Sequence, residues 1–152
     1  MSKEIIKNVN IRNKKASFEY EFLETHVAGI VLKGTEIKAI RMSKASISEA
    51  YCLFDKEELW IKNMNISTYD KGSFYNHDPL SARKLLLKKA ELKKLLVHSK
   101  EKGLTMIALR LFTNERGYAK VEIALAKGKK LYDKRESIKS KDNEREMQRT
   151  KY

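Results

Sequence analysis

The stretch "LTMIALRLFTNERGYAKVEIALA", residues 104–126, decides the fold of this chain. In its second half, apolar and polar or small residues alternate, so that Lys120, Glu122 and Ala124 separate Ala119, Val121, Ile123 and Leu125. A period of two places one face of a β-strand against a core. The polar segment "TNERG" between the two apolar runs is typical of a turn. The stretch therefore predicts a β-hairpin.

Earlier segments carry further strand patterns. In "SFEYEFL", Phe18, Tyr20 and Phe22 alternate with polar residues, and "VAGIVL" (27–32) is a continuous apolar run that predicts a more buried partner strand. The segments "ISEAYCLF" and "LWIKNMNI", joined by the polar "DKEE", predict another hairpin. The polar stretch "STYDKGSFYNHDP" then predicts an irregular loop.

A short helix is expected in "KGTEIKAIR", where Thr35 can cap the first turn and Ile37 and Ile40 share one face. The opposite face of this helix would present Glu36, Lys38 and Arg41.

A longer helix is expected from about Ser81 to Lys100, because Leu85, Leu92 and Leu96 recur at helical spacing and Gly103 is a stop signal. Strands do not alternate regularly with helices, which argues against a parallel α/β sheet. The sequence therefore predicts a mainly β fold: an OB-fold-like, closed or partly open small barrel with one short and one longer helix, followed by a basic C-terminal tail.

The charge balance points to an anionic partner. The chain of 152 residues has 33 Lys and Arg against 20 Asp and Glu, a formal net charge of +13. Nucleic acid is the first candidate and an anionic membrane the second. No stretch approaches the roughly 20 apolar residues that span a bilayer, and "MSKEIIKNVN" lacks the apolar core of a signal peptide. We therefore expect a cytoplasmic protein, and RNA rather than DNA, because an OB-like platform suits unpaired bases.

Catalytic patterns are scarce. His26, His77 and His98 lack metal-ligand spacing, and the sequence contains no glycine-rich phosphate loop, HExxH or CxxC. The group "NHDP" (76–79) has two interpretations, a backbone-bonded turn or part of a metal-dependent nuclease that would use Glu36, His77 and Asp78. The turn is favoured, so that no enzymatic activity, cofactor or metal is expected. The single cysteine, Cys52, is expected to be a small buried hydrophobe.

The end of the chain differs from the rest. From Lys127 to Tyr152 there are ten Lys and Arg against five Asp and Glu, and the few large apolar residues form no continuous stripe. Such a segment cannot bury enough surface to fold alone, yet its residues are compatible with a helix. We therefore expect an RNA-binding body over 1–130 and a tail over 131–152 that is disordered when free and helical when bound.

Several quoted stretches together resemble the SmpB family, the SsrA-binding proteins of bacterial trans-translation. They are "NKKA", "YEFLETHVAGIVLKGTEIKAIR", "NHDP", "ARKLLLKKAELKKL", "EKGLT" and "GYAKVEIALAKGKKLYDKRE". The resemblance implies a non-catalytic OB-fold body that binds the tRNA-like domain of transfer-messenger RNA (tmRNA, SsrA RNA) and delivers it to stalled 70S ribosomes. The tail would occupy the decoding centre, formed by 16S rRNA, and the vacant mRNA channel. The resemblance further implies elongation factor Tu as a partner through the shared RNA, and a monomer.

Transferred by motif, the resemblance implies two sets of site residues. The tail set, which would lie near the decoding centre, is Tyr132, Asp133, Lys134 and Arg135. The RNA-binding set is Asn13, Lys14, Glu36, Lys38, Arg41, Arg83, Lys84, Leu87, Lys120, Lys127, Lys129 and Lys130. A ribosomal or general single-strand-binding OB protein remains the alternative function.

Overall fold

A computed structural model describes residues 9–69 and 76–129. Most of its regular structure is β, as predicted, and three helices interrupt the strands in the described residues. The elements are β1 (Asn10–Arg12), α1 (Ala16–Glu19), β2 (Tyr20–Ile30), α2 (Gly34–Arg41), β3 (Ala45–Ser46), β4 (Tyr51–Asp55), β5 (Glu58–Lys62), β6 (Asn65–Ile66), β7 (Arg83–Leu86), α3 (Lys89–Ser99), β8 (Leu104–Thr113) and β9 (Ala119–Gly128).

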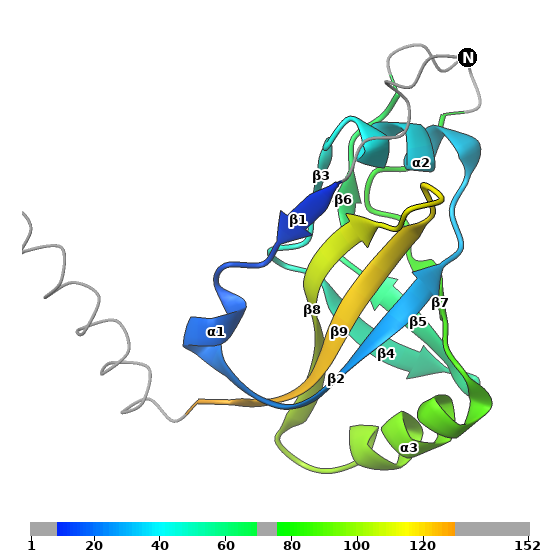
Figure 1. Cartoon of the computed structure of the whole chain (residues 1–152). Coiled ribbons are helices and arrows are strands. Elements are labelled where there is room, and N and C mark those ends of the chain that lie inside the picture. The colour runs from blue at the N-terminus through cyan, green and yellow to red at the C-terminus, as the bar shows by residue number, and fades with distance from the viewer. Residues whose placement is uncertain (1–8, 70–75, 130–152) are drawn as a thin grey trace, which may run out of the picture.

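The main sheet closes on itself as a ring. Its strand order is β1-β8-β4-β5-β7-β2-β9, and β9 pairs in turn with β8. Figure 1 shows this ring with α3 across one end and α2 near the other. A closed ring leaves few unpaired strand edges, which protects a small β protein from edge-to-edge association. The OB-like prediction is thus confirmed at the level of a small, ring-shaped β fold.

Both predicted hairpins are present. β8 and β9 pair from Leu104↔Lys127 to Thr113↔Ala119, and β4 pairs with β5 around a turn at Lys56 and Glu57, both of which have positive φ. Two successive positive φ values are the geometry that matches the twist of paired strands. The alternating residues of β9, Val121, Ile123 and Leu125, point into the core, as their pattern predicts.

The N-terminal strand pattern is only partly right. Ala16–Glu19 forms the short helix α1 instead of strand, because Ala16 packs against Ala124 and Ala126 of β9 and is 2% exposed. The two strands predicted over 17–32 are one strand, β2, with an irregular register between Phe22 and Glu24 opposite β9. That irregularity interrupts the alternation and makes one strand look like two.

The longer helix begins later than predicted. Residues 83–86 form strand β7, in which Leu85 is fully buried opposite Ile30 of β2. Helix α3 starts at Lys89 after Lys88, whose backbone N–H donates to the Glu91 carboxylate at 3.4 Å. Leu85 belongs to β7 but lies at helical spacing from Leu92 and Leu96, so that the sequence pattern placed the start of the helix too early.

The short helix α2 is present, but its predicted cap is wrong. Lys33 occupies the N-cap position, and its backbone N–H donates to Glu36 Oε1 at 2.8 Å. The Thr35 hydroxyl instead lies 2.8 Å from His77 Nδ1. The prediction for Cys52 is confirmed: its side chain lies in the core, and burial raises the pKa of the thiol to about 12.

Candidate nucleic-acid interface

The outer surface of β7, β2, β9, β8 and β1 forms one continuous face, here called the outer face. Side chains of directly paired residues lie on the same side of a sheet. The strand registers therefore align one row through Val27, Glu122, Arg110 and Arg12. They align a second row through Leu86, Gly29, Lys120, Phe112 and Asn10.

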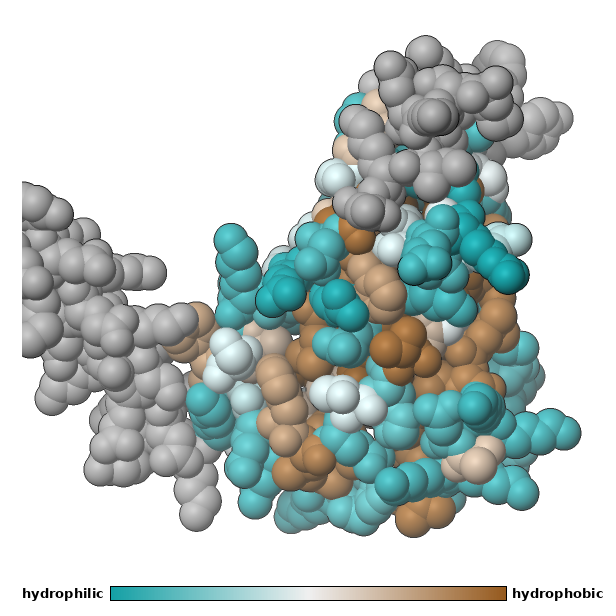
Figure 2. All heavy atoms as spheres, in the orientation of Figure 1, coloured by the Kyte–Doolittle hydropathy of each residue, from teal (hydrophilic) through white to brown (hydrophobic). Residues whose placement is uncertain are grey.

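Apolar and cationic groups are mixed on this face. Val27 is 50% exposed and Leu86 51% exposed, and the Arg110 guanidinium lies 4.0 Å from the ring centroid of Phe112. In Figure 2, hydrophobic side chains lie among hydrophilic ones across the side on which Figure 1 places β2, β9 and β8. Half-exposed apolar residues beside cations are typical of surfaces that bind the sugars and bases of RNA as well as its phosphates.

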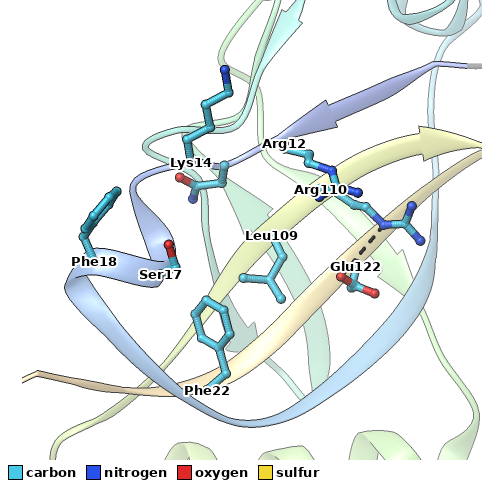
Figure 3. A pocket seen from close by; sticks show the side chains of 9 residues that line it. Arg12, Lys14, Ser17, Phe18, Phe22, Leu109, Arg110 and Glu122 are labelled. Atoms are coloured by element: carbon cyan, nitrogen blue, oxygen red, sulfur yellow. Dashed lines mark ion pairs between the residues drawn. The ribbon is translucent and has the colours of Figure 1, made fainter. Parts of the chain in front are cut away.

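A hollow of about 870 Å³ lies at one end of the outer face, beside α1. Figure 3 shows Arg12 and Arg110 at one side of this hollow and Phe18 at the other, with Leu109 and Phe22 between them and Lys14 at the top. Asn13 lines it too, so that the predicted pair "NK" at 13–14 does reach a concave surface.

Glu36 and Arg83 do not lie on a surface. Glu36 is 2% exposed and Arg83 3% exposed, and the Arg83 Nε–H donates to Glu36 Oε2. The Arg83 guanidinium also donates to the carbonyl of Met64 at 2.6 Å and to those of Asp78 and Pro79 at 3.1 Å each. The prediction that α2 presents Glu36 on an exposed face is therefore wrong. A carboxylate and a guanidinium so fully paired tie α2 to β7 and to the loop before it.

The "NHDP" group is a turn, as favoured from sequence. Asn76 Oδ1 accepts from the backbone N–H of Tyr69 at 3.2 Å, and Asp78 Oδ1 accepts from that of Leu80 at 3.0 Å. His77 is 3% exposed, and its Nε2 lies 2.9 Å from the Ile66 carbonyl oxygen. Within residues 9–69 and 76–129, no group of three or more His, Cys, Asp or Glu is placed to hold a metal ion. Glu36 and His77, two of the three groups of the nuclease interpretation, are engaged in holding the fold.

The other predicted contacts fall into separate regions. On α2, the Lys38 ammonium lies 5.4 Å from the Tyr69 ring centroid, and Arg41 Nη2 donates to the Gly117 carbonyl at 3.1 Å. This bond holds α2 against the β8–β9 turn. Lys120 follows that turn at the start of β9 and lies in the second row of the outer face.

Lys84 lies on β7, where its Nζ is 2.6 Å from Glu58 Oε2 and both side chains are partly exposed. Leu87 packs against the core, whereas its neighbour Leu86 is on the outer face.

The last predicted body residues lie beside α1. Lys127 is exposed at the end of β9, and the Lys129 backbone N–H and Nζ donate to the carbonyls of Glu19 at 3.0 Å and Ser17 at 2.8 Å. Lys130 and the tail set Tyr132, Asp133, Lys134 and Arg135 lie outside the described residues.

Sequence reasoning missed Val27 and Leu86, since apolar runs such as "VAGIVL" and "KLLL" predict core. The available signal was the period of two. With Ala28 and Leu85 buried, the residues beside them must face outward.

The profile of the family described as "SmpB protein" matches residues 10–152. The chain belongs to the SmpB family. It is 91% identical over 148 residues to an SsrA-binding protein of Cytophaga hutchinsonii, with 97% of each chain covered. An SsrA-binding protein of Phocaeicola vulgatus is 58% identical over 141 residues, which cover 93% of this chain and 94% of that one.

A solved structure described as "tmRNA-SmpB: a journey to the center of the bacterial ribosome" contains a chain similar in both fold and sequence. The match has a TM-score of 0.69 at 46% identity and covers 85% of this chain and 94% of the other. Among the described residues, no helix is both long and apolar enough to cross a membrane.

Proposed function

We propose that this SmpB family member binds tmRNA through its body and delivers it to stalled 70S ribosomes in trans-translation. The observation that carries the proposal is the outer face, where half-exposed Val27 and Leu86 lie beside Lys120 and Arg110, in a chain 91% identical to an SsrA-binding protein. Apolar contacts suit riboses and base faces, and the cations suit phosphates. Structured RNA is read mainly by such shape-dependent contacts.

The predicted residues divide by role. Glu36 and Arg83 hold the elements that carry the contacts and do not touch RNA themselves. Leu86 takes the place of Leu87 on the outer face. The direct contacts then include Val27, Leu86 and Arg110 of the outer face, together with Asn13, Lys14, Lys38, Arg41, Lys84, Lys120, Lys127, Lys129 and Lys130.

The tail, 131–152, is proposed to enter the decoding centre and the vacant mRNA channel, with Tyr132 stacking on a base and Lys134 and Arg135 meeting phosphates. The chain would act in the cytoplasm as a monomer, without catalysis of its own, and meet elongation factor Tu through the shared RNA. A message in the channel would compete with the tail, so that the tail senses stalling.

Two measurements test this proposal. Competition against bulk tRNA separates a specific tmRNA partner from a general single-strand-binding protein, which would bind both RNAs with similar affinity. Truncation after Lys130 should leave tmRNA affinity nearly unchanged and abolish tagging on stalled ribosomes. Parallel loss of both properties would contradict the division between body and tail.

A further inference from the structure

Two arginines lie side by side at one end of the hollow. Arg12 of β1 and Arg110 of β8 are direct partners in the antiparallel register, and both line the hollow. Like charges directly opposite each other destabilise a strand pair. The Glu122 carboxylate is 3.8 Å from Arg110 Nε, longer than a hydrogen bond, and no described residue forms an ion pair with Arg12. An anion bound between the two guanidinium groups would relieve the repulsion that the single, distant Glu122 carboxylate leaves.

The hollow that the two arginines line also contains an aromatic ring. Phe22, at 39% exposure, lies on the floor of the hollow beside Leu109 (Figure 3). Arg110 is held by its contact with Phe112, so that its guanidinium is oriented before any ligand arrives. An exposed aromatic side chain in the same hollow as cations suits an unpaired nucleotide, with the base on the ring and the phosphate on the cations.

The hollow also has a polar group that lacks a partner. Two hydrogen bonds hold Asn13 in place. Its Nδ2 donates to the Ala108 carbonyl at 2.9 Å, and its backbone N–H donates to the Leu109 carbonyl at 2.8 Å. Its Oδ1 is buried and accepts no hydrogen bond within the described part of the chain. Buried acceptors in proteins nearly always have a donor. A hydroxyl or amino group of a bound nucleotide would supply one.

We propose that the hollow binds one unpaired nucleotide of the RNA. Its phosphate lies between Arg12 and Arg110, its base stacks on Phe22, and a ribose hydroxyl or base N–H donates to Asn13 Oδ1. A volume of about 870 Å³ is within the range of sites that enclose small ligands. The inference rests on the proposed function and adds to it a subsite that double-stranded RNA cannot fill, since its bases are already stacked and paired.

The test compares Phe22→Leu with Phe22→Tyr, which keeps the stacking ring, and with Leu23→Ala as a matched control. Leu23 adjoins Phe22, is 50% exposed and does not line the hollow. Binding is measured to tmRNA, to a short single-stranded oligoadenylate and to the duplex of that strand with oligouridylate. Phe22→Leu should weaken oligoadenylate binding by roughly 5- to 150-fold with an unchanged salt slope, because stacking is not ionic. Arg12→Gln should lower the salt slope of oligoadenylate binding by about 0.7, as expected for one lost phosphate contact to a single strand.

Phe22→Tyr and Leu23→Ala should both bind within about twofold of the unaltered chain. The subsite is overturned if Phe22→Leu does the same, or if it weakens binding of the duplex as much as of the single strand. Failure of the proposed function looks different, since the unaltered chain would then show no preference for tmRNA over bulk tRNA. Circular dichroism of each variant checks that it is folded.

Discussion

Replacement of Arg83 by methionine tests the buried ion pair directly. The change removes the guanidinium and leaves the Glu36 carboxylate, 2% exposed, as an unpaired buried charge. It also takes a donor from the carbonyls of Met64, Asp78 and Pro79. Removal of one partner of a buried pair costs about 3–5 kcal/mol, a large share of the roughly 5–15 kcal/mol that holds an ordinary domain together.

Urea unfolding followed by circular dichroism measures this cost. With a slope of about 2 kcal/mol/M, the midpoint should fall by about 1.5–2.5 M. Lys84→Met, at the next position of β7, is the matched control. The Lys84–Glu58 pair has side chains 40% and 45% exposed, and such surface pairs contribute about 0–1 kcal/mol. Glu36→Gln, which keeps the size of the side chain, provides a second variant in case Arg83→Met does not fold.

RNA binding by the same variants separates the two roles predicted for Arg83. Lys84→Met should lower the salt slope of tmRNA binding by about 0.7–0.9, as expected for one lost phosphate contact. Arg83→Met, measured where it remains folded, should leave the slope unchanged, because a buried guanidinium touches no phosphate. An equal fall in slope for both variants, or an equal shift in both urea midpoints, would refute the buried placement of Arg83.

Three further outcomes are expected. Burial alone would raise the pKa of Glu24, but hydrogen bonds from Lys94 and His26 outweigh it and lower that pKa; the bond from His26 likewise lowers that of Glu91. The lowered pKa values of these two carboxyl groups stabilise the folded chain above pH 4.5, and this stability is lost as the pH falls through the folded pKa values. In a Glu24→Gln and Glu91→Gln double variant, the urea midpoint should therefore fall less steeply as the pH is lowered below 4.5. The Cys52 thiol, with a pKa of about 12, should not react with a disulfide reagent at pH 8 until urea unfolds the chain. Leu86→Ala should weaken tmRNA binding without changing its salt slope, as gel-shift titrations at several salt concentrations would show.

The sequence predicts this fold best where the strands pair with chain neighbours. The β8–β9 hairpin is visible because Val121, Ile123 and Leu125 all face one core. Strand β7 is not visible in this way. It has four residues and pairs with β5 and β2, which are distant in the chain. Its leucines continue the spacing of α3, so that local pattern favours a helix until long-range pairing overrides it.

The sequence predicts the kind of partner that the site suits better than it predicts where each site residue lies. Net charge and the polar motifs favour RNA as the partner, and Asn13 and Lys14 reach the hollow. Burial could not be inferred for Glu36, since a charged residue on a short helix is normally exposed. Its burial depends on Arg83, which lies 47 positions further along the chain.

The buried pair also explains how so short a strand can hold its outward-facing side chains in one register. Strand β7 has only two paired positions with β5 and two with β2, and a slip of one residue would turn Leu86 inward and Leu85 outward. Arg83, the first residue of β7, points inward and is held by one carboxylate and three carbonyls. A guanidinium has a fixed geometry of donors, so these acceptors accommodate Arg83 in one position only. The pair therefore selects the register in which the side chains of Lys84 and Leu86 point outward, toward the surface that we propose binds RNA.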